Sequence, residues 1–127
     1  MPAGARILIA DDEADCRDLL VLALRGAASE IAVATNGGEL LEMIAERGPF
    51  DLIVTDINMP WMQGLHVLAS IREAGLRTPV LIVTGLSHPD LPRSTARLGR
   101  AKLLYKPFAI GQLREAIAEL LAIEDLG

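Results

Sequence analysis

The chain has 127 residues and a net charge of −5, and its residues are 51% hydrophobic but only 3% aromatic. The length fits one domain, the aliphatic composition is typical of an α/β core with strands covered on both faces, and the negative charge argues against direct binding of nucleic acid. The single cysteine, Cys16, excludes an internal disulfide bond, and the lack of a long apolar run or an apolar leader argues against a membrane role, so we expect a cytoplasmic protein.

Short apolar runs with strand character alternate with helical patterns along the chain. In chain order we expect strand 6–10, helix 13–25, strand 30–34, helix 38–47, strand 51–55, helix 64–74, strand 79–84, a helix within 90–99, strand 102–105 and helix 109–123. Pro89 and Pro92 disfavour a helix interior, so the fourth helix should begin only near Arg93. The alternation predicts one α/β domain over residues 1–127, with a parallel sheet, helices on both faces and right-handed crossovers.

Polar residues gather where the strands end, at the edge where sheets of this kind bind ligands. Asp11 and Asp12 follow the first strand, Asp56 follows the third, Thr84 ends the fourth and Lys106 follows the fifth. Clustered carboxylates repel one another unless a cation joins them, and Mg²⁺ prefers carboxylate and phosphate oxygens. An aspartate flanked by Mg²⁺, an amine and a hydroxyl is suited to attack phosphorus and form an aspartyl-phosphate.

Each of these residues also has a plain structural interpretation. Asp56 could cap a helix or stand in water at a strand end, and Asp11 with Asp12 could form a solvated acidic start to the first helix. The hydroxyl could bond locally, and the lysine could be solvated. Glu13 is interpreted only as an acid that favours the helix dipole. The shared placement of the other residues at strand ends favours the functional interpretation.

Four short motifs carry a resemblance to a known family. They are Asp11-Asp12, Asp56-x-Asn58-Met59-Pro60-x-Met62-x-Gly64, Thr84-Gly85 and Lys106-Pro107-Phe108. Together, in this order and each at a strand end, they resemble the CheY-like receiver domain of two-component response regulators. The resemblance covers nearly the whole chain, and it includes the spacing of 22 residues from Thr84 to Lys106.

The resemblance implies both a topology and a site. The fold would be a flavodoxin-like (βα)5 doubly wound parallel sheet with strand order 2-1-3-4-5. Asp56 would accept a phosphoryl group, and Mg²⁺ or Mn²⁺ would be held by Asp11, Asp12, Asp56 and the backbone carbonyl of Asn58. Asp12 would bind the metal directly, and Asp11 through water.

The resemblance also implies how the signal leaves the site. Thr84 would turn toward the phosphoryl group, Lys106 would bind it, and the Lys106–Pro107 peptide bond would be cis. Receivers commonly place Tyr or Phe three residues before the lysine, but Leu103 stands there and the aromatic residue is Tyr105. Both residues are therefore switch candidates, and the two side chains share one face of the strand.

The implied partners are proteins. A histidine kinase or a phosphotransfer protein would supply the phosphoryl group, and a downstream protein or an output domain beyond this chain would read the signal. Direct contact with a membrane or with nucleic acid is not expected. The face formed by the fourth helix, the fifth strand and the fifth helix would be the usual output surface, and it could form a homodimer.

Two other functions stay open at this point. The chain could be a pseudo-receiver, never phosphorylated, that acts as a constitutive interaction module, and Leu103 with the two prolines motivates that alternative. A phosphatase of the haloacid-dehalogenase type would need a second aspartate as general acid where Asn58 stands, so we expect no separate substrate turnover.

A basic cluster stands out against the acidic composition of the chain. It consists of Arg93, Arg97, Arg100 and Lys102. The cluster is either a solvated face or a surface on which a partner docks.

Overall fold

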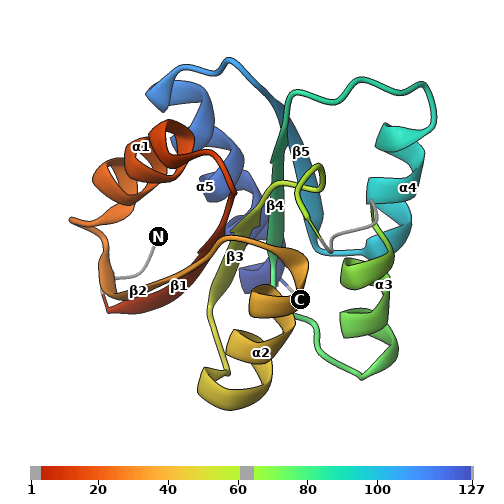
Figure 1. The fold of residues 1–127 in the computed structure, drawn as a ribbon, viewed down its shortest axis with the longest axis horizontal. Coiled ribbons are helices and arrows are strands. Elements are labelled where there is room, and N and C mark those ends of the chain that lie inside the picture. The colour runs from red at the N-terminus through yellow and green to blue at the C-terminus, as the bar shows by residue number, and fades with distance from the viewer. Residues whose placement is uncertain (1–3, 61–64, 127) are drawn as a thin grey trace.

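The computed structural model describes residues 4–60 and 65–126, with side chains described up to residue 121. Strands and helices alternate strictly along the described chain, and the strands form one central sheet with helices on both sides (Figure 1). The five strands are β1 (Ala5–Ala10), β2 (Ala28–Ala34), β3 (Leu52–Thr55), β4 (Val80–Thr84) and β5 (Ala101–Tyr105). All pairings are parallel, and the order is β2-β1-β3-β4-β5. The α/β class and the strand order implied by the resemblance are confirmed.

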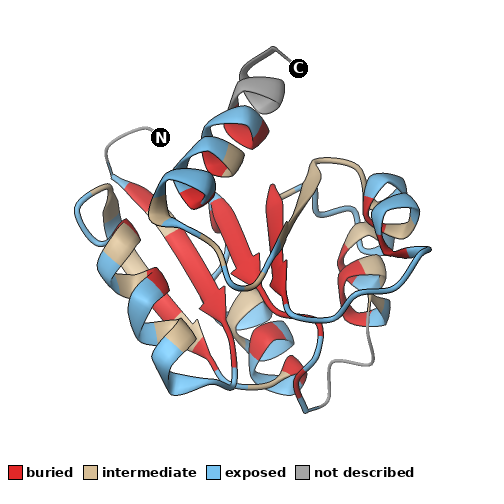
Figure 2. Cartoon of the chain, turned by 90° about the horizontal axis from the view of Figure 1, so that it is seen from above, coloured by how far each residue is buried: buried red, intermediate tan, exposed pale blue. Residues whose placement is uncertain are grey.

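The five helices divide between the two faces of the sheet. They are α1 (Ala14–Leu24), α2 (Gly37–Arg47), α3 (His66–Glu73), α4 (Leu91–Leu98) and α5 (Ile110–Leu126). Buried side chains of α1 and α5 pack on one face, and those of α2, α3 and α4 pack on the other. The strand residues alternate between these two clusters, since Leu8 and Ile53 join the second while Ile7, Ile9 and Val54 join the first. Figure 2 shows the buried residues concentrated in the central strands.

The fourth helix begins earlier than the sequence predicted. We expected it to begin near Arg93, but α4 begins at Leu91, with Asp90 as its N-cap. Pro92 is the second helical residue. Because the first N–H groups of a helix have no partner within it, a proline there removes no hydrogen bond. The expected start of the third helix at Gly64 lies outside the described residues, as does Met62.

One arginine ties α3 to the connection between α4 and β5. Arg72, in the last turn of α3, donates from Nε to the carbonyl of Leu98 and from Nη2 to that of Gly99, both at 2.8 Å. Gly99 has φ 66°, a backbone conformation that favours glycine. Arg72 therefore holds carbonyls at the end of α4 that the helix itself leaves without partners.

We expect the substitution Arg72→Met to lower the free energy of unfolding by about 2–3 kcal/mol, because carbonyls bonded to a charged donor lose that donor. Urea unfolding followed by circular dichroism measures the change. The matched control is Arg25→Met at the exposed end of α1. A loss within about 0.5 kcal/mol for Arg72→Met, as for an ordinary surface residue, would show that these hydrogen bonds do not stabilise the fold.

Candidate functional site

The register of the sheet brings two predicted site residues together. Ala10 of β1 pairs with Thr55 of β3, so the residues that follow them, Asp11 and Asp56, leave the sheet side by side. The Asp56 N–H donates to the carbonyl of Ala10 at 2.9 Å, which continues the sheet ladder by one residue. Both side chains are buried, with 0% of Asp11 and 3% of Asp56 exposed. An apolar sheet thus ends in two buried carboxylates.

The Asp56 carboxylate is fixed at both oxygens. Oδ1 accepts hydrogen bonds from the N–H groups of Ile57 at 2.6 Å and Asn58 at 2.9 Å. Oδ2 lies 2.9 Å from Nζ of Lys106. The backbone turn after β3 therefore orients the carboxylate, and the amine from the end of β5 neutralises it.

Lys106 is the positive centre of the site. Its Nζ lies 2.9 Å from Oδ2 of Asp11, 2.9 Å from Oδ2 of Asp56 and 2.8 Å from Oε1 of Glu13. Burial by itself lowers the Lys106 pKa, but the contacts with the carboxylates of Glu13, Asp56 and Asp11 outweigh that effect, so the pKa is raised. The amine stays protonated at neutral pH. Its contact with Glu13 was not predicted, and only the position of an acid directly after Asp12 could have indicated it.

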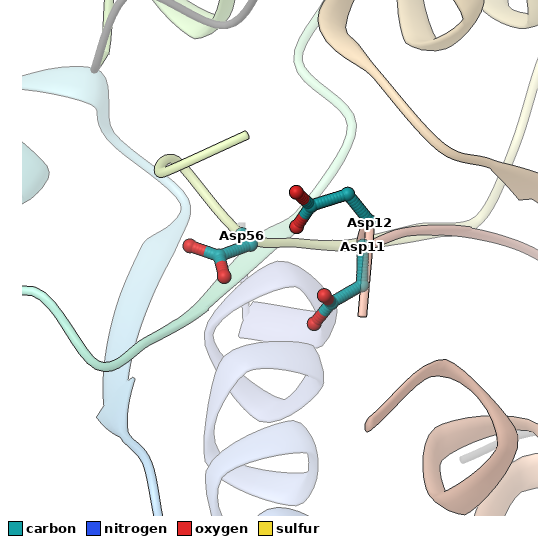
Figure 3. A group of neighbouring side chains, drawn as sticks. All are labelled: Asp11, Asp12 and Asp56. Carbon is teal, nitrogen blue, oxygen red and sulfur yellow. The ribbon is translucent and has the colours of Figure 1, made fainter. Parts of the chain in front are cut away.

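The acidic group has the composition of a cation site. Asp11, Asp12 and Asp56 each offer a carboxylate oxygen, and these oxygens lie within 4.8 Å of one another (Figure 3). Oδ2 of Asp11 is fully buried and accepts no hydrogen bond from the described residues, although Lys106 Nζ stands close to it as an ion-pair partner. A buried carboxylate oxygen that accepts no hydrogen bond is a suitable ligand for a hard cation. Asp12 is exposed, so the acidic group is open to water. The residues fit Mg²⁺.

Thr84 lies at the same edge but bonds elsewhere. Its side chain is fully buried, and its Oγ1 accepts the N–H of Leu86 at 3.1 Å. The N–H of Lys106 donates to the Thr84 carbonyl at 2.9 Å, so the ends of β4 and β5 are held together. The threonine hydroxyl thus links the site edge to the backbone that leads toward α4.

The two switch candidates of β5 differ in their surroundings. Leu103 is half-buried against the cluster of α2, α3 and α4, while Tyr105 is 41% exposed. Leu104, between them, packs against the cluster of α1 and α5, as the alternation along a strand requires. The peptide bond between Lys106 and Pro107 is cis.

A family model described as the response regulator receiver domain matches residues 7–118. The chain belongs to the response regulator receiver family. Members of this family act as phosphoacceptors and signalling modules of two-component systems, and they bind Mg²⁺ in an acidic pocket. Within the part of this receiver that the structure describes, no helix is long and apolar enough to cross a bilayer.

Relatives of the receiver include parts of longer regulators. It is 34% identical to the response regulator protein PilR of Pseudomonas aeruginosa over 94% of this chain and 27% of PilR. It is also 34% identical to the transcriptional regulatory protein PrrA of Mycobacterium tuberculosis, over 91% of this chain and 49% of PrrA. The receiver therefore spans between about a quarter and a half of these relatives.

Solved structures show the same fold. The receiver domain of a putative Luxo repressor protein from Vibrio parahaemolyticus matches with a TM-score of 0.83 and 26% identity, over 97% of this chain and 96% of that one. The chemotaxis response regulator CheY4 of Vibrio cholerae matches with a TM-score of 0.79 and 27% identity, over 93% and 99%. The receiver fold therefore covers nearly the whole chain.

We expect millimolar Mg²⁺ to raise the free energy of unfolding of the receiver, because the cation binds the folded acidic group and offsets its repulsion. The gain is about 1.4 kcal/mol when Mg²⁺ is at about tenfold its dissociation constant. Urea unfolding with and without Mg²⁺ measures it. Asp12→Asn should abolish the gain, while Asp18→Asn on the exposed side of α1 should retain it. Equal gains in both variants would show that Mg²⁺ binds elsewhere.

Proposed function

We propose that this receiver accepts a phosphoryl group on Asp56 from a histidine kinase or a phosphotransfer protein. The observation that carries the proposal is the Asp56 carboxylate, buried, oriented by two backbone N–H groups and 2.9 Å from the Lys106 amine. In the transfer, an Asp56 carboxylate oxygen forms a bond to phosphorus while the N–P bond of the donor phosphohistidine breaks. The electron pair of that bond stays on the donor imidazole, which takes up a proton.

The acidic group would hold Mg²⁺ through Asp11, Asp12, Asp56 and the backbone carbonyl of Asn58. When bound, the cation supplies positive charge against the phosphoryl oxygens. The residues of the chain do the remaining work. The turn after β3 holds Asp56 in one orientation through its N–H groups. Lys106 remains protonated and stabilises the negative charge of the transferred group.

The signal would leave the site through Thr84. Its hydroxyl oxygen now accepts the N–H of Leu86. A phosphoryl group on Asp56, with about −1.5 to −2 charges, would attract the hydroxyl as a donor and release that N–H. The segment between β4 and α4 would then shift, and Leu103 or Tyr105 would adjust beside it. A downstream protein, an output domain beyond this chain or a second copy bound at the face of α4, β5 and α5 would read the change.

Intact mass after incubation with acetyl phosphate and Mg²⁺ tests the acceptor. We expect a gain of one phosphoryl group, because the oriented carboxylate and the amine favour transfer, and no gain in Asp56→Asn or without Mg²⁺. A phosphoryl group on the Asp56→Asn variant would place the acceptor elsewhere. No gain in any arm would favour the constitutive interaction module instead.

Removing the amine should slow the transfer while leaving the acceptor in place. We expect Lys106→Met to reduce the rate of phosphorylation from acetyl phosphate by about 10²-fold, the usual cost of losing one group that stabilises transition-state charge. The matched control is Lys102→Met, since Lys102 lies on β5, the strand directly before Lys106, but pairs with Glu119 of α5. A folded Lys106→Met variant with an unchanged rate would rule out that role for the lysine.

A further inference from the structure

A groove lies between α3 and α4, beside the segments that follow β3 and β4. Its volume is about 590 Å³, within the range of sites that hold a ligand or a few side chains. Figure 1 shows α3 and α4 as neighbours on one side of the sheet, with the connection from the carboxyl end of β4 leading to α4. The apolar residues that line it are Ile57, Leu65, Ala69, Leu86, Leu91 and Leu98. Leu86 is 42% exposed, so an apolar side chain stands open to solvent there.

Arginines flank the groove on the side of α4. Arg97 lines it, and Arg93 lies one turn earlier, and both are exposed. Like charges four residues apart destabilise a helix, so this arrangement does not serve the helix itself. Among the residues whose side chains are described, neither arginine has an ion-pair partner, whereas Lys102 and Lys106 both do.

A second group of arginines extends the positive charge to the end of the groove where α3 and α4 finish. Arg100 donates to the carbonyl of Arg77, and Arg72 lies close to both. The Arg72 pKa is lowered by burial first and then by the positive charges of Arg77 and Arg100. These guanidinium groups repel one another, and an anion close to them would relieve that repulsion.

One stretch of the sequence carries a net positive charge. Residues 74–114 contain seven Lys and Arg and a single acid, Asp90, for a net charge of +6. The rest of the chain contains five Lys and Arg against sixteen acids, for a net charge of −11. The lining of the groove carries Arg97 and Asp90, whose charges offset each other, so the positive charge comes from Arg93 and the other arginines beside it. A positive flank on an acidic protein selects for an acidic partner and steers it to one side.

We propose that the groove between α3 and α4 binds an acidic amphipathic segment of a partner protein. The apolar side chains of the segment fill the groove around Leu86 and Leu98, and its carboxylates pair with Arg93 and Arg97. A phosphodiester backbone would leave the apolar lining uncovered, and a membrane surface could not enter a concave groove, so a peptide fits best. This inference goes beyond the proposed function, because it needs no phosphoryl group on Asp56.

The test uses the whole unphosphorylated chain and a synthetic helical peptide as probe. The peptide carries Leu at positions i, i+3, i+4 and i+7 and Glu elsewhere, and its control is a scrambled peptide of equal composition. Fluorescence anisotropy should give a dissociation constant about tenfold lower for the amphipathic peptide than for the scrambled one. The double variant R93E/R97E should weaken binding about tenfold, and R25E/R114E, which changes net charge equally, should not.

Amide chemical shifts place the bound peptide on the molecule. We expect the largest shifts at Ala69, Leu86, Ser94 and Leu98. Equal binding of the scrambled peptide, equal loss in both double variants, or tighter binding of duplex DNA would overturn the proposal. No acetyl phosphate is used, so a failure here is independent of whether Asp56 is phosphorylated.

A second copy of the chain is the competing occupant. Its α1 exposes an acidic and apolar stripe formed by Asp15, Asp18, Leu19 and Leu22. Sedimentation velocity at rising protein concentration distinguishes the two cases. If the chain self-associates and R93E/R97E abolishes the association, the groove binds a second copy of the chain, and the proposal is overturned. A monomer at all concentrations, with peptide binding as expected, supports it.

Discussion

The site depends on one amine placed among carboxylates. Lys106 Nζ contacts Asp11, Glu13 and Asp56 within 3 Å, and two of those three acids are almost fully buried. Without the amine, these negative charges would repel one another in a region of low dielectric. The positive charge of Lys106 therefore stabilises this cluster of carboxylates. A divalent cation at the same group would reduce that repulsion further.

The register of the sheet fixes the relative positions of the side chains in that cluster. β1 and β3 are central strands, and every residue of β3 is buried. Their register fixes Asp11 beside Asp56, and the pairing of Thr84 with Tyr105 at the ends of β4 and β5 places Lys106 opposite them. A shift of one residue in either pairing would turn the side chains to the other face of the sheet. The packing of the apolar strands thus decides the geometry of the charged edge.

The two faces of the sheet are covered differently. The helices α1 and α5 cover one face with a continuous cluster that begins next to Asp11. The helices α3 and α4 cover part of the other face and leave a groove between them that reaches Ile57 and Leu86, the neighbours of the site. The proposed phosphoacceptor site and the proposed docking groove therefore meet at Ile57 and Leu86.

The sequence predicted most elements to within two residues, because apolar periodicity reports local burial. It was wrong about the start of α4, because a proline is tolerated where the helix needs no N–H donor, and the helix boundary decides whether Pro92 stands at such a position. It also missed the contact of Glu13 with Lys106, two residues that are 93 positions apart. The periodicity of a sequence reports which residues are buried locally, but not the distance between two strand ends.

The sequence by itself determined the alternation of strands and helices, the parallel sheet and the set of acids, hydroxyl and amine at the strand ends. These follow from local periodicity and from the chirality of crossovers, which are properties of neighbouring residues. Only the tertiary structure decided that Lys106 contacts three carboxylates at once, that Thr84 bonds to Leu86, and that Arg97 lines one groove with residues of α3. Those contacts arise when helices and strands pack, and their distances depend on the whole fold.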